Sequence, residues 1–215
     1  MNESGLILDK LTILRGDAPL VSVDLRIAPG EVVTVMGPSG VGKSTLLAAI
    51  TGTLAPDFAL RGGIRLDGQD LTALPPEARH VGILFQDDLL FPHLSVGANL
   101  AFGLAPRIKG RAARRARVEE ALAEIGLAGF AERDPATLSG GQKARVALMR
   151  MLLSEPHALL LDEPFSRLDA ALRGQIRQLV FSRARALGLP TLLVTHDAAD
   201  AEAAGGRVIE LAAMG

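Results

Sequence analysis

The sequence predicts an α/β fold in which helices cover a parallel β-sheet and an antiparallel β layer lies beside it. Two apolar runs, residues 32–36 and 158–161, have the length and composition of strands buried on both faces. The first leads through a glycine-rich loop into a helical pattern at residues 45–50, and the second ends in two carboxylates. With 48% hydrophobic residues among 215, the chain can bury one substantial core.

The antiparallel layer is predicted from the first part of the chain. Residues 6–35 have strand patterns separated by turn signals at Arg15-Gly16-Asp17 and Ala28-Pro29-Gly30. Residues 63–68 form a further strand pattern that ends in an Asp-Gly pair, which is typical of a hairpin turn. These segments should pair with one another beside the glycine-rich loop.

A helical subdomain is predicted as an insert between two parts of the core. Residues 87–154 are rich in helical patterns and are expected to form an insert, while approximately residues 1–86 and 155–215 form the core. We expect the whole chain, residues 1–215, to be one functional domain.

The glycine-rich loop matches the complete phosphate-binding pattern G-x-x-x-x-G-K-[ST]. Its residues, with the first residue of the following helical pattern, are Gly37, Pro38, Ser39, Gly40, Val41, Gly42, Lys43, Ser44 and Thr45. Glycines allow successive backbone N–H groups and a helix N-terminus to point at an anion, and Lys43 adds a positive charge. A turn without a ligand is the alternative, but it requires neither the lysine nor the serine. On its own the pattern predicts only that the chain binds a nucleotide, and we expect a P-loop NTPase (RecA-like) core.

Asp162 and Glu163 follow the second apolar run, at the end of a strand where open α/β sheets bind their ligands. Asp162 and the hydroxyl of Ser44 are hard oxygen ligands of the kind that Mg²⁺ prefers. Glu163 is then free to act as a general base on a water molecule, which typically contributes roughly 10²- to 10⁴-fold in rate. A solvated acidic pair before Pro164 is the alternative, and the neighbouring P-loop argues against it.

A second glycine-containing motif, Leu138-Ser139-Gly140-Gly141-Gln142, precedes a helical pattern. Ser139 and Gln142 have the spacing of a helix capping box. A cap does not require the two glycines, which destabilise the first turn of a helix. Gly140 and Gly141 therefore suggest the close approach of another group, and we expect that group to be a phosphate.

With these motifs in order, the sequence resembles the ATP-binding subunits of ABC transporters over nearly its whole length. The matching features are the P-loop, Gln86 after a strand, the LSGGQ segment at 138–142, Asp162-Glu163, the Ser166–Asp169 turn and His196. The resemblance implies a homodimer in the ATP-bound state, with two subunits packed head to tail. Each ATP would be held between the P-loop of one subunit and Ser139, Gly140, Gly141 and Gln142 of the other.

The resemblance also implies roles for three further residues. Gln86 is similar to the glutamine that contacts Mg²⁺ or the attacking water, and His196 to the histidine that contacts the terminal phosphate. Asp169 is similar to the aspartate that communicates across the dimer, although it also has the position of a helix cap. The other histidines, His80, His93 and His157, are expected on the surface.

The segment 85–96 resembles that of bacterial importer ATPases for polyamines, thiamine, ferric ion or oxyanions. The resemblance implies integral membrane permease subunits as partners, together with a solute-binding protein that acts with the permease. The expected docking surface is the apolar segment Phe85–Leu104, with ordinary core as the alternative. Its large apolar residues after Phe85 are Leu89, Leu90, Phe91, Leu94, Val96, Leu100 and Phe102. The remaining functional alternatives are a non-transport ABC-type ATPase and a regulatory nucleotide-binding partner.

Two positions depart from the family pattern. The family stacks adenine on an aromatic residue near Leu14, but the chain has no aromatic residue before Phe58. The missing stacking interaction would be worth about 0.5–1.5 kcal/mol, so base selectivity should be loose. Arg167 occupies a turn position where the family has a small residue, and a salt contact at the dimer interface is one interpretation.

Composition limits the other function classes. A net charge of −1 gives no basic field to attract nucleic acid, so no nucleic-acid partner is expected. The basic cluster around 109–117 is interpreted as a solvated helix face. The chain has no cysteine, its first residues lack a signal-peptide pattern, and no apolar run reaches the roughly 18 residues of a membrane span. With the resemblance to transporter subunits, which implies docking on separate membrane proteins, we expect a peripheral protein at the cytoplasmic face of the inner membrane.

Overall fold

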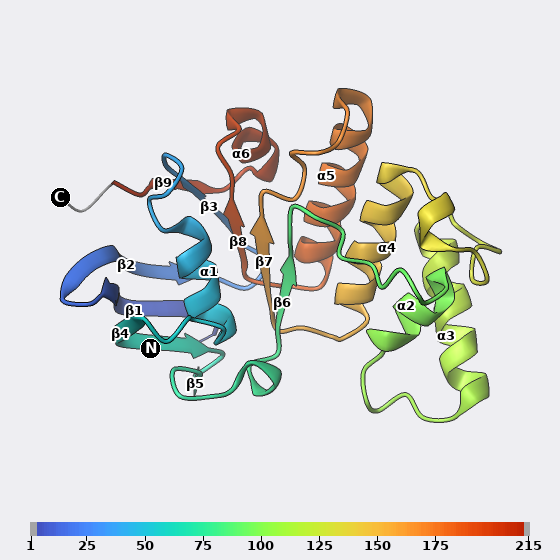
Figure 1. The fold of residues 1–215 in the computed structure, drawn as a ribbon, viewed down its shortest axis with the longest axis horizontal. Coiled ribbons are helices and arrows are strands. Elements are labelled where there is room, and N and C mark those ends of the chain that lie inside the picture. The colour runs from blue at the N-terminus through green and yellow to red at the C-terminus, as the bar shows by residue number, and fades with distance from the viewer. Residues whose placement is uncertain (1–3, 213–215) are drawn as a thin grey trace. The chain divides into compact units, whose positions relative to one another are not determined.

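The computed structural model describes residues 4–212, without the side chain of Ala171, and confirms the predicted α/β fold (Figure 1). The chain divides into two compact units. One consists of the chain up to Ile83, His157–Glu163 and the chain from Arg177 onward. The other consists of Leu84–Pro156 and Pro164–Ile176. The second unit thus contains the predicted helical insert together with residues 164–176, which the sequence analysis placed in the core.

The first unit contains the expected antiparallel sheet, with strand order β2-β1-β4-β5. Its strands are β1 (Leu6–Arg15), β2 (Ala18–Ile27), β4 (Phe58–Leu66) and β5 (Gln69–Asp70). Leu8 and Leu11 of β1 are both fully buried although they are three residues apart. The register of β1 against β2 shifts between them, and Lys10 has a left-handed φ of 44°. A β-bulge therefore absorbs the extra residue and keeps the apolar side chains on one face.

The parallel sheet of the first unit has the strand order β6-β7-β8-β3-β9. Its strands are β3 (Val32–Met36), β6 (Val81–Leu84), β7 (Ala158–Asp162), β8 (Thr191–Val194) and β9 (Arg207–Glu210). Val194 pairs with Val35 on one side and with Asp162 on the other, both in parallel. The carboxyl ends of β3, β7 and β8 consequently lie at the same edge of the sheet.

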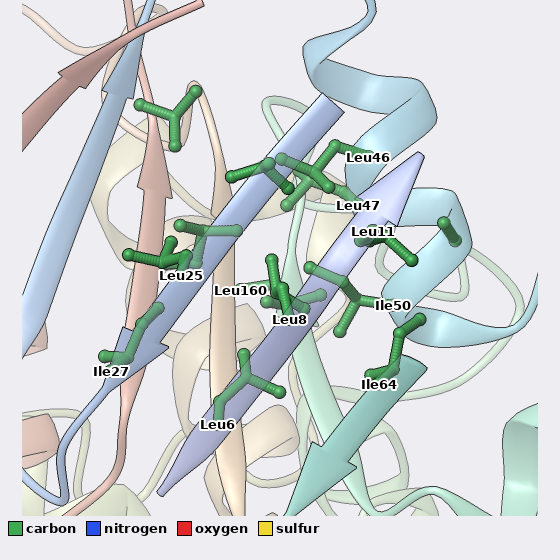
Figure 2. Packing of buried hydrophobic residues seen from close by; sticks show 14 of the residues in the cluster. Leu6, Leu8, Leu11, Leu25, Ile27, Leu46, Leu47, Ile50, Ile64 and Leu160 are labelled. Atoms are coloured by element: carbon green, nitrogen blue, oxygen red, sulfur yellow. The ribbon is translucent and has the colours of Figure 1, made fainter. Parts of the chain in front are cut away.

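The core of this unit lies where helix α1 (Lys43–Thr51) meets both sheets. Figure 2 shows Leu46, Leu47 and Ile50 of α1 beside Leu11 of β1 and Leu160 of β7. All five side chains are at most 1% exposed. Burial of a side chain of this size stabilises the fold by roughly 1.5–3 kcal/mol, so α1, and with it the loop that precedes it, is firmly held.

The second unit is helical and contains α2 (Val96–Phe102), α3 (Arg111–Glu124) and α4 (Gly140–Leu152). Asn99 of α2 is fully buried, and its amide bonds the backbone of the preceding segment at Phe91, Leu94 and Ser95. The segment before α2 is thereby fixed to the helix. Helix α5 (Ala170–Ala186) begins in this unit and ends in the first.

The basic cluster is only partly the solvated face that we expected. Arg114 donates hydrogen bonds to the carbonyls of Ala101, at 2.6 Å, and Ile108, at 3.3 Å. Arg117 forms ion pairs with Glu120 and Glu124. Arg114 therefore links helix α3 to the segment between α2 and α3, and Arg117 forms ion pairs along α3 itself.

The region after Asp197 contains a further helix and a further strand. Helix α6 (Ala198–Ala204) begins at Asp197, whose carboxylate caps the amide of Ala199 at 2.8 Å. Strand β9 then pairs in parallel with β3, from Val33↔Arg207 to Met36↔Glu210. The sequence analysis predicted neither element.

Thr34, in the middle of β3, provides a test of the packing. Its side chain is fully buried and its hydroxyl has no hydrogen-bond partner within the described part of the chain. A buried hydroxyl without a partner costs free energy, whereas valine has the same shape and no polar atom. Thr34→Val should raise the free energy of unfolding by about 1 kcal/mol, which corresponds to a melting temperature about 2–4 °C higher for a chain of this size.

Thr191 in the neighbouring strand β8 is the matched control. It is equally buried, but its hydroxyl donates to the carbonyl of Leu189 at 3.0 Å. Thr191→Val should therefore lower the melting temperature in the same thermal-unfolding measurement. Equal effects of the two substitutions would contradict this explanation.

Candidate functional site

The P-loop follows β3, and its backbone shows why glycine is required there. Gly40 and Gly42 have φ angles of 82° and 99°, in the left-handed region that side chains with a Cβ disfavour. A Cβ on Gly42 would also lie 2.3 Å from Cγ2 of Val21 in β2. The loop thus packs directly against the antiparallel sheet, and a substitution at Gly42 would displace it.

Lys43 is buried in this loop, with only 8% of its surface exposed. Its ammonium group donates to the carbonyls of Gly37 at 2.7 Å and Pro38 at 2.9 Å. A buried ammonium group needs such partners, since desolvation of an unpaired charge is very costly. These bonds hold the positive charge inside the curve of the loop, where an anionic group would meet it.

Asp162 lies at the end of β7 and accepts a hydrogen bond from the hydroxyl of Ser44 in α1. Burial raises the pKa of Asp162, the Ser44 bond lowers it, and neighbouring Glu163 raises it. The net direction is upward, so the ionised form is destabilised. A cation beside this carboxylate would relieve that cost, and both side chains offer the oxygen ligands that Mg²⁺ prefers.

Glu163 turns away from the strand immediately after Asp162. Its φ of 46° is left-handed, and its N–H still donates to the carbonyl of Val194 at 2.9 Å. One carboxylate oxygen of Glu163 lies 3.0 Å from Nδ1 of His196, which follows β8. Because an ionised carboxylate only accepts hydrogen bonds, this contact requires the proton of the imidazole to be on Nδ1. The structure therefore brings together the predicted residues Ser44, Asp162, Glu163 and His196.

The LSGGQ segment forms the predicted capping box at the start of α4. The amide of Gln142 donates to Oγ of Ser139 at 3.3 Å, and the amide of Ser139 donates to Oε1 of Gln142 at 3.0 Å. The two glycines differ. A Cβ on Gly141 would lie 2.4 Å from the side chain of Leu172, whereas a Cβ on Gly140 would meet nothing within 4 Å. Gly141 thus has a packing reason within the chain, which the sequence analysis did not anticipate.

The remaining predicted residues lie in the second unit. Gln86 is exposed and lies two residues after β6, which ends at Leu84. Asp169 accepts the amide of Leu172 at 3.0 Å, which confirms its position as a helix cap. Arg167 forms an ion pair with Asp87 of the same chain.

The position near Leu14, where the family stacks adenine, offers little surface for a base. Leu14 is only 6% exposed. The exposed side chain at this end of β1 belongs to Arg15, which has 73% of its surface accessible. Nε of Arg15 lies 4.0 Å from Oδ2 of Asp57. Two register shifts along β1, the second between Ile13 and Leu14, determine which side chains are buried, and periodicity alone cannot locate them.

Sequence analysis also missed a group of buried polar residues next to His196. Asp200 of α6 is 2% exposed and contacts both Arg177 of α5 and Thr195, which immediately precedes His196. The one available signal was an aspartate in an alanine-rich segment four residues after the histidine.

Comparisons with known proteins identify the family of the chain. The ABC transporter domain family matches residues 20–166. The chain is 54% identical over 184 residues to YnjD of Escherichia coli K12, an uncharacterized ABC transporter ATP-binding protein, with 86% of this chain and 84% of that protein covered. It is 47% identical over 207 residues to the thiamine import ATP-binding protein ThiQ of Cereibacter sphaeroides, with 96% and 88% covered.

A further relative, the Fe(3+) ions import ATP-binding protein FbpC 1 of Haemophilus influenzae, is 42% identical over 209 residues, with 97% of this chain and 63% of that protein covered. None of the helices within residues 4–212 combines the length and apolar character needed to cross a membrane. The P-loop, the acidic strand end and these similarities lead to one assignment: the chain belongs to the ABC transporter family of ATP-binding subunits, which hydrolyse ATP to drive transport.

Proposed function

We propose that this chain powers the import of a small solute by binding and hydrolysing ATP as a homodimer docked on separate membrane permease subunits. The observation that carries the proposal is the pair of contacts at one sheet edge, Ser44 to Asp162 and His196 to Glu163, next to the P-loop. A metal-binding pair and a base with a partner are the groups that phosphoanhydride hydrolysis requires.

The P-loop and Asp162 are proposed to hold MgATP. Residues 37–45 would surround the phosphates with backbone N–H groups, and Lys43 would exchange its carbonyl partners for phosphate oxygens. Ser44, Asp162 and Gln86 would hold Mg²⁺, which supplies charge neutralisation between phosphates when bound. The Ser44–Asp162 hydrogen bond fits this role because it already places two oxygen ligands together.

Glu163 is proposed as the general base, and His196 as the residue that contacts the terminal phosphate. The left-handed backbone of Glu163 turns its carboxylate out of the strand, and the bond to His196 restricts its orientation. A base held in this way can accept the proton of an attacking water without first paying for its own ordering. Gln86 would contribute to the position of that water.

The dimer is proposed to form head to tail when ATP binds. Ser139, Gly140, Gly141 and Gln142 would contact the nucleotide held by the partner's P-loop, and Asp169 would transmit the state of one site to the other. In support, the open surroundings of Gly140 leave its backbone accessible. Contacts made only in the closed dimer would shift the population toward it when ATP is present.

Import is proposed because relatives such as ThiQ and FbpC 1 are named as import ATP-binding proteins. Permease subunits and a solute-binding protein would be the partners, and the chain would lie peripherally at the cytoplasmic face of the membrane. The proposed docking surface is narrower than the segment expected from sequence. Phe85, Leu89 and Phe102 are 42%, 55% and 69% exposed, whereas Val96 and Leu100 are buried.

The role of Glu163 can be tested with Glu163→Gln. The amide keeps the shape and the hydrogen-bonding capacity toward His196 but cannot accept a proton, so ATP hydrolysis should fall by roughly 10²- to 10⁴-fold. ATP binding should remain, and an ATP-bound dimer should accumulate in size-exclusion chromatography with Mg²⁺. Lys43→Ala serves as the contrast, since calorimetry should show the loss of tight nucleotide binding. Full turnover by Glu163→Gln would remove Glu163 from the base role.

Base selectivity can be tested by nucleotide competition. No aromatic residue precedes Phe58, and Leu14 is buried, so phosphate contacts should dominate affinity. GTP should therefore compete with ATP within about tenfold, a difference of about 1.4 kcal/mol. A GTP affinity several orders of magnitude weaker would show that another part of the chain recognises adenine.

Docking can be tested with Phe102→Glu. Phe102 is 69% exposed, and its ring centroid lies 4.7 Å from that of the half-buried Phe91. A charge at this position should abolish recovery of polytopic partners from detergent-solubilised membranes, while ATPase activity of the isolated protein is retained. Val208→Glu is the matched control, because Val208 of β9 is also apolar and 50% exposed. Equal recovery by both variants would exclude Phe102 from the interface, and recovery of no membrane protein by the unsubstituted chain would favour a non-transport role.

A further inference from the structure

An ion pair with a buried carboxylate lies next to the His196 turn, and the hydrolytic roles above do not use it. Asp200, in the first turn of α6, is 2% exposed, and Arg177 of α5 contacts it through both Nε and Nη2. Ions at this depth lose their hydration and are retained only with good partners. The chain thus keeps a costly pair of charges close to its candidate site.

The pair continues into a hydrogen-bond chain with a fixed direction. The hydroxyl of Thr195, which is 1% exposed, donates to Oδ2 of Asp200 at 3.1 Å. The same hydroxyl accepts the backbone N–H of Asp197 at 3.1 Å. A carboxylate bound to a guanidinium only accepts, and a backbone N–H only donates. Thr195 therefore has one possible arrangement, in which its hydroxyl links Asp200 to the backbone of Asp197.

One of these bonds joins the two residues on either side of His196 in the sequence. Thr195 precedes it and Asp197 follows it, so a hydrogen bond between them closes a turn around the histidine. The N–H of Thr195 also donates to the carbonyl of Val35 at 3.3 Å, and Nη2 of Arg177 lies 3.7 Å from Oδ2 of Asp197. The side chain of His196 itself is 65% exposed. Its position therefore depends on the backbone of the turn more than on packing around its ring.

We propose that Asp200, oriented by Arg177 and acting through Thr195, is the positioning residue of His196. The buried charge fixes the Thr195 hydroxyl, the hydroxyl fixes the turn, and the turn places Nδ1 of His196 against Glu163. The expected effect of Asp200 and Thr195 on hydrolysis rests on the proposed function. Their expected effect on the geometry of His196 does not depend on that function.

Thr195→Val tests the proposal because it keeps the shape and removes both hydroxyl bonds. Misplacement of a catalytic group by about 1 Å can cost about 10²-fold in rate, so kcat for ATP should fall at least about tenfold. KM should change less than about twofold, because the P-loop is intact. Thr195→Ser, which restores the hydroxyl, should recover kcat to within about threefold of the original. Thr191→Val is the matched control, since it removes a buried hydroxyl bond within strand β8, away from the turn, and should leave kcat unchanged.

The imidazole provides a readout that does not depend on activity. The chain has only four histidines, so ¹⁵N resonances of His196 can be assigned with His196→Ala. In the neutral imidazole, the proton should reside on Nδ1 in the unsubstituted chain because of the Glu163 bond. Thr195→Val should shift it toward Nε2, and Thr195→Ser and Thr191→Val should not. Asp200→Asn, which removes the charge that orients Thr195, is the second variant and should reproduce the shift if Thr195→Val does not fold.

The results separate this inference from the proposed function. Unchanged kcat and an unchanged His196 tautomer in Thr195→Val, or in Asp200→Asn if that variant is the one that folds, would overturn the positioning role. Failure of Thr195→Ser to recover either quantity would also overturn it, since the loss would then reflect packing. If Glu163→Gln and His196→Ala hydrolyse ATP normally, the proposed function fails, and the tautomer comparison still decides whether Thr195 and Asp200 hold the imidazole.

Discussion

The parallel pairing of β3, β7 and β8 is the constraint on which the candidate site depends. Val35, Val194 and Asp162 lie in one row across the sheet, so the residues that follow each strand emerge at the same edge. The P-loop, Glu163 and the His196 turn are thereby brought together from three distant parts of the sequence. Because the strands are buried and mostly apolar, the charged side chains of the candidate site lie beyond or at their carboxyl ends.

The segment that follows each of these strands contains either a residue with left-handed backbone angles or a hydrogen bond that involves a buried side chain. The P-loop relies on left-handed Gly40 and Gly42, Glu163 adopts a left-handed conformation without being glycine, and the His196 turn is closed by Thr195. A left-handed conformation costs a non-glycine residue roughly 1–2 kcal/mol. At Glu163 this cost is offset by its backbone bond to Val194 and its contact with His196, which ties the conformation of the acidic strand end to that of the neighbouring loop.

Local chemistry determined what could be predicted from sequence. The P-loop, the capping box at Ser139 and the hairpin turn at Asp67-Gly68 each depend on residues a few positions apart, and the structure contains all of them. Burial of Leu14 depends on a bulge and a second register shift, which the alternation of apolar residues does not reveal.

Long-range partners were beyond sequence analysis. Arg177 and Asp200 are 23 residues apart, on different helices, and nothing in either local pattern predicts their contact. Gly141 similarly owes its identity to Leu172, on another helix. The short strand β9 was missed because its side chains are mostly exposed and therefore give no apolar signal; its pairing with β3 alone defines it.

The contact between His196 and Glu163 also constrains how these residues can act. With its proton on Nδ1, a neutral imidazole presents an unprotonated Nε2, which can accept but not donate a hydrogen bond. Under the proposed roles, contact with a phosphate oxygen requires a donor. His196 must therefore gain a second proton or release Glu163 before it contacts a phosphate. Since a carboxylate has several lone pairs, the bond to His196 leaves Glu163 able to accept a proton from water, and the two proposed roles are coupled only through the orientation that this bond imposes.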